Sequence, residues 1–290
     1  MASGRGMLLL IVGLAAVLGV SCSATGLNPV RSAGQTSSRE FDVSNFTELA
    51  YDTIGTVYIE VGEKESLRLD AETNLLPLFR AEVVDGRLRI RTRACTIIRP
   101  GAPVTFHLTV RSLDTIHVRG SGEVHAPDLV DDGIAHDEIE LKISGSGKLF
   151  AGELRGTSVD LTINGSGDIE TGAITTADQT VRIRGSGRVM MASLEAERLE
   201  LNLPGSGKLR VAEGSVGSQT ITVRGSGDYE AFGVLSAAAE VKVSGSGDAE
   251  ITANEELLAT VSGSGGIQYR GNPTVQSKIS GSGHITPVGD

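Results

Sequence analysis

The sequence predicts an all-β fold, a parallel β-helix, and two observations carry that prediction. The tripeptide Gly-Ser-Gly occurs nine times after residue 119, and between residues 145 and 245 successive copies are 20 residues apart. The residue two positions before every copy is a branched aliphatic. Repetition at such a period is typical of a solenoid, in which each repeat contacts only its neighbours. The first interval is 25 residues long and the last two are 18.

Each repeat begins with a strand that ends at the Gly-Ser-Gly. Apolar residues stand two positions before the first glycine in every repeat and four positions before it in every repeat but the last, and they alternate with polar residues such as Lys142 and Arg182. The nearer column is Val118, Ile143, Ile163, Ile183, Leu203, Val223, Val243, Val261 and Ile279, and the farther one is Ile116, Leu141, Leu161, Val181, Leu201, Ile221, Val241, Ala259 and Ser277. This period of two predicts one buried and one solvated face.

A second short strand follows each turn. Its inward residues are Val124, Leu149, Ile169, Val189, Leu209, Tyr229, Ala249, Ile267 and Ile285. The rest of each repeat offers one more apolar anchor, for example Leu194 or Leu235. No repeat has the length of helical periodicity that a crossover helix needs, so two or three short strands form each coil. Equivalent residues then stack about 4.8 Å apart, and the charges after the first four turns, from Glu123 to Arg188, alternate in sign as stacked side chains prefer.

The glycines of the turns have a structural role in this interpretation. Glycine adopts backbone angles closed to other residues, which lets the strand turn a tight corner in every coil. These structural glycines are Gly120, Gly122, Gly145, Gly147, Gly165, Gly167, Gly185, Gly187, Gly205, Gly207, Gly225, Gly227, Gly245, Gly247, Gly263, Gly265, Gly281 and Gly283. The serines between them lack the G-x-S-x-G spacing of a nucleophile elbow, and Gly-Ser-Gly-Lys lacks the spacing and the helix of a phosphate loop.

Three other folds compete with the β-helix. A leucine-rich repeat has a similar period but needs a leucine pattern that is absent here, and a β-propeller blade needs about 40 residues. The strongest rival is an antiparallel meander with Gly-Ser-Gly as its hairpin turns. That fold would pair the two strands of one repeat, whereas a β-helix pairs equivalent strands of successive repeats.

The first residues are typical of a secretory signal peptide. The apolar run at 7–20 is short for a membrane span and ends at small residues. We expect residues 1–21 to be removed and Cys22 to be lipidated, although Gly19 stands where a lipobox usually has leucine. The alternative is plain secretion, with cleavage near Ala24.

Residues 22–39 are small and polar and predict a flexible tether. The residue after Cys22 is Ser23, and an aspartate at that position would resemble a signal for retention in the inner membrane. Its absence favours an outer-membrane lipoprotein, on either face of that membrane. With Cys22 acylated only Cys95 remains, so we expect no disulfide within the chain and interpret Cys95 as an inert thiol. The net charge of −10 argues against nucleic acid as a partner.

Residues 40–290 are predicted to form a single domain. Its part at 116–290 holds the nine repeats, and its part at 40–115 contains strands without Gly-Ser-Gly. Those strands are expected at 56–61, 66–71, 81–93 and 104–110. Most of the Phe and Tyr residues lie in or just before these strands, and larger side chains at one end of a solenoid predict an irregular β cap.

The segment FDVSNFTELAYDTIGTVYIEVGEKESLRLDAETNLLPLFRAEVVDGRLRIRTR, followed by the train of strand, Gly-Ser-Gly and strand, resembles the putative auto-transporter adhesin, head GIN domain family. The resemblance covers residues 41–290. It implies a right-handed parallel β-helix with Gly-Ser-Gly at the turns between sheets, in an envelope lipoprotein of bacteria with an adhesin role. It supplies no catalytic residues. The chain departs from the family in its degenerate lipobox and in the five extra residues of the first interval.

One candidate binding site is a row of arginines on one face of a predicted strand. The row consists of Arg87, Arg89, Arg91 and Arg93. Guanidinium groups in a row would suit an anionic polysaccharide or a lipid headgroup. The competing interpretation is a solvated face balanced by neighbours such as Glu60, Asp70 and Glu72, or charges that protect a sheet edge.

Two further groups of polar residues carry no predicted site. The acidic stretch at 128–138 is interpreted as a surface loop, and His117 and His125 lie on outward positions beside the first turn. We therefore predict no catalytic residue, no metal site and no cofactor.

The sequence favours a non-enzymatic envelope protein that serves in adhesion or binds a protein or glycan ligand. One alternative is a periplasmic structural or stress-linked protein without an external ligand. The other is a polysaccharide-active enzyme. The constant coils disfavour an enzyme because they hold no insertions to wall a cleft. The chain also has only six Phe, four Tyr and no Trp, so it offers few stacking platforms for sugars. The last coil is expected to meet another copy or a partner, unless Pro273 and Pro287 blunt that end.

Overall fold

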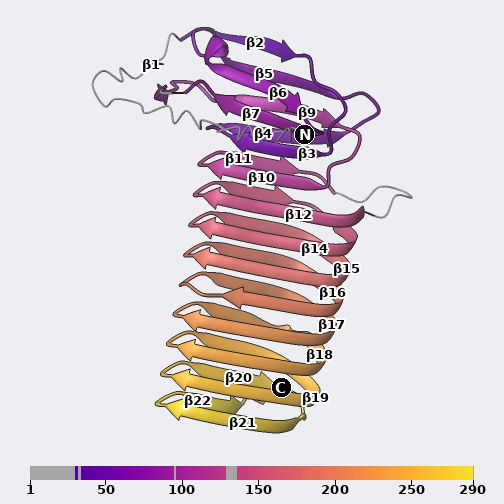
Figure 1. The fold of residues 1–290 in the computed structure, drawn as a ribbon, viewed down its shortest axis with the longest axis vertical. Helices are drawn as coiled ribbons and strands as arrows, with labels where there is room; N and C mark the ends of the chain where they lie inside the picture. Colours follow the sequence, from indigo (N-terminus) through magenta and orange to yellow (C-terminus); the bar gives the residue numbers. More distant parts are fainter. Residues whose placement is uncertain (1–29, 32–33, 95, 129–135, 290) are drawn as a thin grey trace, which may run out of the picture.

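The computed structural model describes residues 30–31, 34–94, 96–128 and 136–289. Its strands stack as successive coils of a β-solenoid (Figure 1). Equivalent strands of neighbouring repeats pair in parallel, so that Ile163 lies beside Ile183, one repeat further along the chain. This pairing confirms the predicted solenoid and excludes the antiparallel meander, in which the two strands of one repeat would pair.

The coils are built from strands on either side of each turn. They are β3 (Glu48–Asp52), β4 (Thr56–Val61), β7 (Arg87–Thr92), β9 (Thr105–Val110), β10 (Thr115–Gly120), β11 (Glu123–Ala126), β12 (His136–Gly145), β13 (Lys148–Ala151), β14 (Leu154–Gly165), β15 (Asp168–Gly185), β16 (Arg188–Leu203), β17 (Lys208–Gly225), β18 (Asp228–Gly245), β19 (Asp248–Gly263), β20 (Gly266–Arg270), β21 (Thr274–Gly281) and β22 (His284–Pro287). Strand β15 pairs with β16 of the next coil over residues 168–171, 173–176 and 178–182, so each coil has three straight segments.

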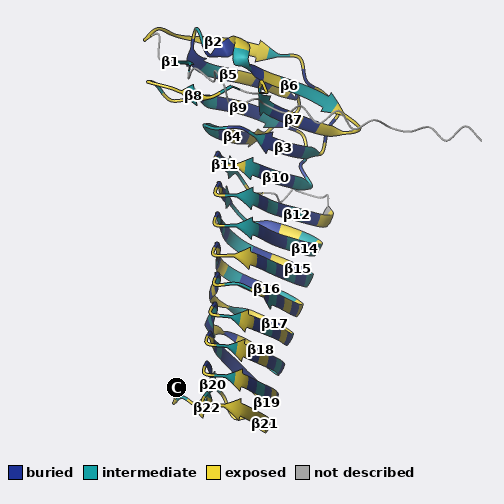
Figure 2. Ribbon diagram, turned by 60° about the vertical axis from the view of Figure 1, so that its left-hand side comes forward, coloured by how far each residue is buried: buried dark blue, intermediate teal, exposed yellow. Residues whose placement is uncertain are grey.

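The core is a set of continuous apolar columns inside the coils, seen as the dark segments in Figure 2. The predicted inward residues from Ile116 to Val261 on both sides of the turns are buried. One predicted anchor was wrong: Leu235 is 52% exposed, and Val234 beside it is fully buried. Val234 pairs with Gly214 of the preceding coil and Leu235 pairs with Ser215. This register places the smaller of the two adjacent apolar side chains in the core.

The turn glycines are required for two separate reasons, which Gly185 and Gly187 illustrate. Gly185 has φ +125°, a conformation that side chains with a Cβ rarely adopt. Gly187 lies against the preceding coil, where a Cβ would come within 2.4 Å of the carbonyl oxygen of Gly167. The amide of Ser186 between them donates to the carbonyl of Gly165 at 2.9 Å, so each turn is hydrogen-bonded to the turn one coil earlier.

The N-terminal portion closes one end of the solenoid. Strands β7 and β9 continue the parallel stack beyond β3 and β4. The remaining elements are β1 (Val30–Arg31), β2 (Thr36–Phe41), β5 (Ser66–Glu72), η1 (Leu76–Leu78), β6 (Phe79–Val84) and β8 (Ile98–Arg99). Strands β2, β5 and β6 pair antiparallel with their neighbours, and Phe79 packs edge to face on Phe106 with ring centroids 5.5 Å apart. The predicted aromatic-rich cap is therefore present, and the strand expected over 81–93 is the hairpin of β6 and β7.

The ordered structure begins before the expected domain boundary at residue 40. Strand β2 starts at Thr36, within the segment predicted to be a tether. Ser38 donates to Asp70 at 2.6 Å, and Arg39 donates to the carbonyl of Leu76 at 3.1 Å. The small polar composition of this segment hid a strand whose hydrogen bonds come from a distant partner, β5. Residues 22–29 lie outside the described residues.

Candidate functional site

The predicted arginine row lies on the outward face of β7, and carboxylates oppose three of its members. Arg87 donates to Glu48 at 2.6 Å and Arg89 to Asp52 at 3.0 Å, and Arg91 forms an ion pair with Glu82 at 2.8 Å. Arg93 follows the end of the strand and is exposed. Anion binding by Arg87, Arg89, Arg91 and Arg93 stays a prediction.

The balancing carboxylates are not the predicted ones. Glu60, Asp70 and Glu72 belong to β4 and β5, whereas β7 pairs with β3 and β6, which carry the actual partners. In this non-repetitive part of the chain, the pairing of strands determines which carboxylates face the arginines. Proximity along the sequence did not identify them.

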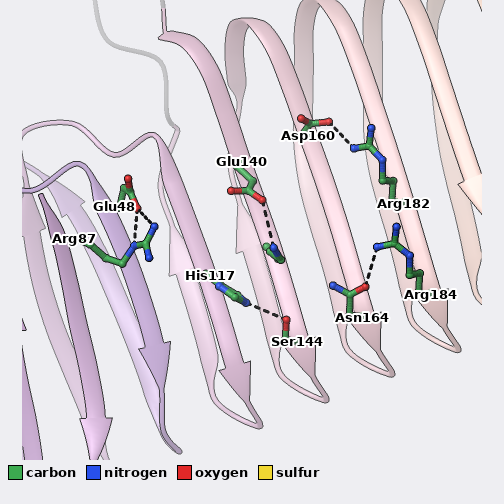
Figure 3. Close-up of polar contacts among 10 residues, drawn as sticks. Glu48, Arg87, His117, Glu140, Ser144, Asp160, Asn164, Arg182 and Arg184 are labelled. Atoms are coloured by element: carbon green, nitrogen blue, oxygen red, sulfur yellow. Dashed lines mark hydrogen bonds and ion pairs between the residues drawn. The ribbon is translucent and has the colours of Figure 1, made fainter. Parts of the chain in front are cut away.

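The same outward face continues along the solenoid as a network that joins one coil to the next (Figure 3). Arg182 reaches Asp160 at 3.3 Å, and Arg184 donates to the amide oxygen of Asn164 at 3.3 Å. His117 contacts Ser144 at 3.0 Å, and burial, followed by the nearby cations, lowers the pKa of His117 to about 4. We interpret these contacts as links between coils.

The column of charges after the turns is also confirmed in part. Arg188 makes two hydrogen bonds to Asp168, at 3.0 and 3.1 Å, and this contact raises the pKa of Arg188. Lys208 lies 3.5 Å from Asp228 and 2.6 Å from Glu230. Opposite charges one coil apart therefore contact each other at two of the steps where the sequence alternates in sign, Asp168 to Arg188 and Lys208 to Asp228.

A row of aromatic rings runs across the outward face after the first turns. Pairing brings together one residue from each of six strands, in the order Glu40 (β2), Arg68 (β5), His107 (β9), Tyr58 (β4), His125 (β11) and Phe150 (β13). The last four, which we call the ring row, stack with centroid separations of 6.2, 5.0 and 4.7 Å along the order given. Tyr58 is 46% exposed. The row thus presents ring edges to solvent over several strands.

Carboxylates flank the ring row on one side. Asp70 lies 3.2 Å from His107 and 2.8 Å from Arg68, and Glu123 lies 2.5 Å from His125. The hydrogen bond from Ser38, with further help from Arg68, lowers the pKa of Asp70. An ionised acceptor is therefore held directly beside the rings.

A surface groove of about 520 Å³ adjoins the ring row at Tyr58 and His107. We call it the N-terminal groove. Its charged residues come from β2, from β4, from the loop after β4 and from β5: Glu40, Glu60, Lys64 and Arg68. Phe41 adds a second aromatic side chain. Donors, acceptors and rings thus converge on one concave surface, which is the usual arrangement of a binding site.

Sequence reasoning missed both features. Although the chain has few aromatic residues, four rings from distant positions share one row. The outward position of His125 was the only available signal, since the equivalent positions of the neighbouring strands hold Tyr58 and Phe150.

Some predicted features lie outside the described residues. These are Cys22, Cys95 and most of the acidic stretch, 129–135. Of that stretch, Asp128 is described, and its carboxylate accepts from the backbone N–H of Glu153 at 2.7 Å. In the part of the chain that the structure describes, no cluster of metal-ligating side chains forms and no helix has the length and apolarity to cross a bilayer.

Comparison with known proteins identifies relatives of this fold. The family model described as putative auto-transporter adhesin, head GIN domain, matches residues 45–179 and 171–273. No curated protein matches the chain. Among solved structures, one described as a putative lipid binding protein from Parabacteroides distasonis is 24% identical, with a TM-score of 0.66, over 90% of this chain and 100% of that one.

Two further solved structures are described as putative adhesins. The protein from Parabacteroides merdae is 21% identical, with a TM-score of 0.61, over 89% of this chain and 98% of that one. A second protein from Parabacteroides distasonis is 22% identical, with a TM-score of 0.61, over 90% of this chain and 100% of that one. At these identities the likeness concerns the fold.

Proposed function

The chain belongs to the putative auto-transporter adhesin, head GIN domain family, and on that premise we propose that it is a non-enzymatic envelope protein that binds a glycan in its N-terminal groove. The family description supports an adhesin type of protein at the cell envelope or surface. The coils between residues 145 and 245 have a constant length of 20 residues, which supports a scaffold because they carry no insertions that would wall a catalytic cleft.

The observation that carries the proposal is the N-terminal groove beside the ring row. A sugar chain has hydroxyl groups that donate to carboxylates and accept from cations, together with apolar C–H faces that pack on aromatic surfaces. Glu40 and Glu60 supply acceptors, and Lys64 and Arg68 supply donors. Tyr58 supplies an exposed ring edge for C–H contacts, because His107 and His125 cover its two faces. An acyl chain would remove these four charged groups from water without offering them hydrogen bonds, which is costly, so the lining favours a polyhydroxylated ligand over a lipid tail.

Replacing the exposed ring tests the groove. We expect Tyr58→Ala to weaken glycan binding about tenfold, because loss of one central aromatic contact typically removes more than 1 kcal/mol of binding free energy. The measurement is binding of the purified full chain to an array of bacterial and animal polysaccharides, followed by calorimetric titration with the best of them.

The matched control is Leu235→Ala, which removes another exposed apolar side chain far along the solenoid. It should leave glycan affinity unchanged. Equal affinity of wild type and Tyr58→Ala for every bound glycan, or binding of fatty acid in place of glycan, would contradict the proposal.

Anchoring by a lipid on Cys22 is part of the same proposal. The apolar run before Cys22 and the small residues around it support it. A cell fed a clickable fatty acid should label the wild-type chain and leave Cys22→Ser unlabelled, with the variant released from the membrane fraction. A labelled Cys22→Ser chain would contradict the anchor and leave the groove proposal untouched.

A further inference from the structure

The last coil of the solenoid exposes side chains that every earlier coil buries. Val275 and Ile279 are 36% and 49% exposed, whereas their equivalents one coil earlier, Leu257 and Val261, are buried. All eight residues of β21 are exposed, as the yellow strand at the lower end of Figure 2 shows. Within the described residues β21 pairs with β19 alone, so its second edge offers a row of free N–H and C=O groups.

The other end of the solenoid is sealed. There η1 and the antiparallel strands cover the core, and Leu75 and Phe79 are fully buried. Its outer strands carry charged side chains, such as Arg39 and Glu40 in β2, which discourage edge-to-edge pairing. A head-to-tail chain of molecules would need two complementary open ends, and only one end of the described solenoid is open.

We propose that the open end binds a second copy of this chain, with β21 of one molecule antiparallel to β21 of the other. The two-fold axis passes beside Ser277. In this register Val275 faces Ile279 of the partner copy on the inward side, and Gln276 faces Lys278 of the partner copy on the outward side. Both exposed apolar side chains of each copy are then covered.

The sequence of β21 favours this register over its neighbours. Sliding the partner strand by two residues in either direction places Val275 or Ile279 opposite Ser277, and no apolar side chain of β21 then faces another. The register centred on Ser277 also pairs the whole stretch from Thr274 to Ser280 and sets no like charges opposite each other.

A second copy fits better than an unrelated strand because this strand is complementary to itself. Antiparallel addition to a sheet edge uses main-chain hydrogen bonds for affinity and alternate side chains for specificity. The same patch on both partners gives a closed dimer, in which no open edge of β21 remains. The inference stands apart from the proposed glycan site, which lies at the opposite end of the solenoid (Figure 1).

Substitutions at Gln276 test the register in both directions. The full chain, purified in mild detergent, should sediment as a dimer. Gln276→Lys places a lysine opposite Lys278 twice in the dimer and should raise the dimer dissociation constant about 2- to 30-fold. Gln276→Glu creates two opposite-charge pairs at the same places and should lower that constant by a similar factor. Because Gln276 is exposed, neither change should disturb the fold.

A cross-link tests the position of the two-fold axis. Ser277→Cys should form a disulfide between two copies in oxidising buffer, because the two substituted residues face each other. Ser280→Cys is the control, since its copies would lie about 20 Å apart along the strands. A monomer at all concentrations, shifts of the same sign for both Gln276 variants, or equal cross-linking by Ser280→Cys and Ser277→Cys would overturn the proposal.

Discussion

Leu194→Ala is expected to lower the free energy of unfolding by about 2–5 kcal/mol, the range for a fully buried leucine. Leu194 stacks between Ile174 and Gly214 in the apolar column of the second segment of each coil. Truncation leaves a cavity between coils that tight stacking cannot close. Urea denaturation followed by circular dichroism at a strand wavelength measures the change.

Leu235→Ala is the matched control, because it is the same substitution on the same side of the solenoid with the side chain half exposed. It should change the free energy of unfolding by no more than about 0.5 kcal/mol. A larger loss for Leu235→Ala than for Leu194→Ala would show that the register places Leu235 inward, as its hydrophobicity alone suggests. The stability of a solenoid is approximately a sum of contributions from neighbouring coils, and its unfolding can depart from two-state behaviour. Both the midpoint and the slope of each urea unfolding curve should therefore be compared between the variants.

Gly187→Ala is expected to destabilise the protein by about 1–3 kcal/mol or more through overpacking. The added Cβ would lie 2.4 Å from the carbonyl oxygen of Gly167 and 2.6 Å from Cγ2 of Ile163, so neighbouring coils must separate at that turn. The separation would also lengthen the hydrogen bond from the amide of Arg188 to Gly167, now 3.2 Å. Thermal and urea unfolding of the variant measure the loss.

Two controls separate the causes of this loss. Gly86→Ala changes a glycine with φ +75° and open space around its Cβ position, so it measures backbone strain without crowding, about 1–2 kcal/mol. Ser186→Ala alters the exposed centre of the same tripeptide and should be close to neutral. If Gly187→Ala proves as mild as Ser186→Ala, the close approach between coils is not what requires the second glycine.

The two proposals together give the molecule distinct ends. The ring row and the N-terminal groove lie in the portion that follows the expected lipid anchor, and the open edge of β21 lies at the opposite end (Figure 1). A dimer through β21 would place the two N-terminal portions at opposite ends of one long solenoid. That geometry would suit a protein that links two surfaces.

How far the sequence could go depended on whether a feature repeats. In the repeats, the alternation of apolar and polar residues, as around Val181 and Ile183, is a local pattern. The 20-residue spacing gives successive coils the same register. Together these two features predicted the strands and most of the core. Where the spacing carried no such information, prediction failed. Val234 and Leu235 are adjacent and both apolar, and only the coil beneath them selected the inward one.

The sequence by itself determined the solenoid, its turns and its apolar columns, because each depends on a pattern within about 20 residues. The tertiary structure alone decided the ring row and the N-terminal groove, since Arg68, His107, Tyr58 and His125 come from neighbouring strands of the cap and the first repeat whose order in space differs from their order in the chain. It also showed why the second glycine of each turn is needed, which is its close contact with the preceding coil. Such contacts join residues that are distant along the chain, and no local pattern records them.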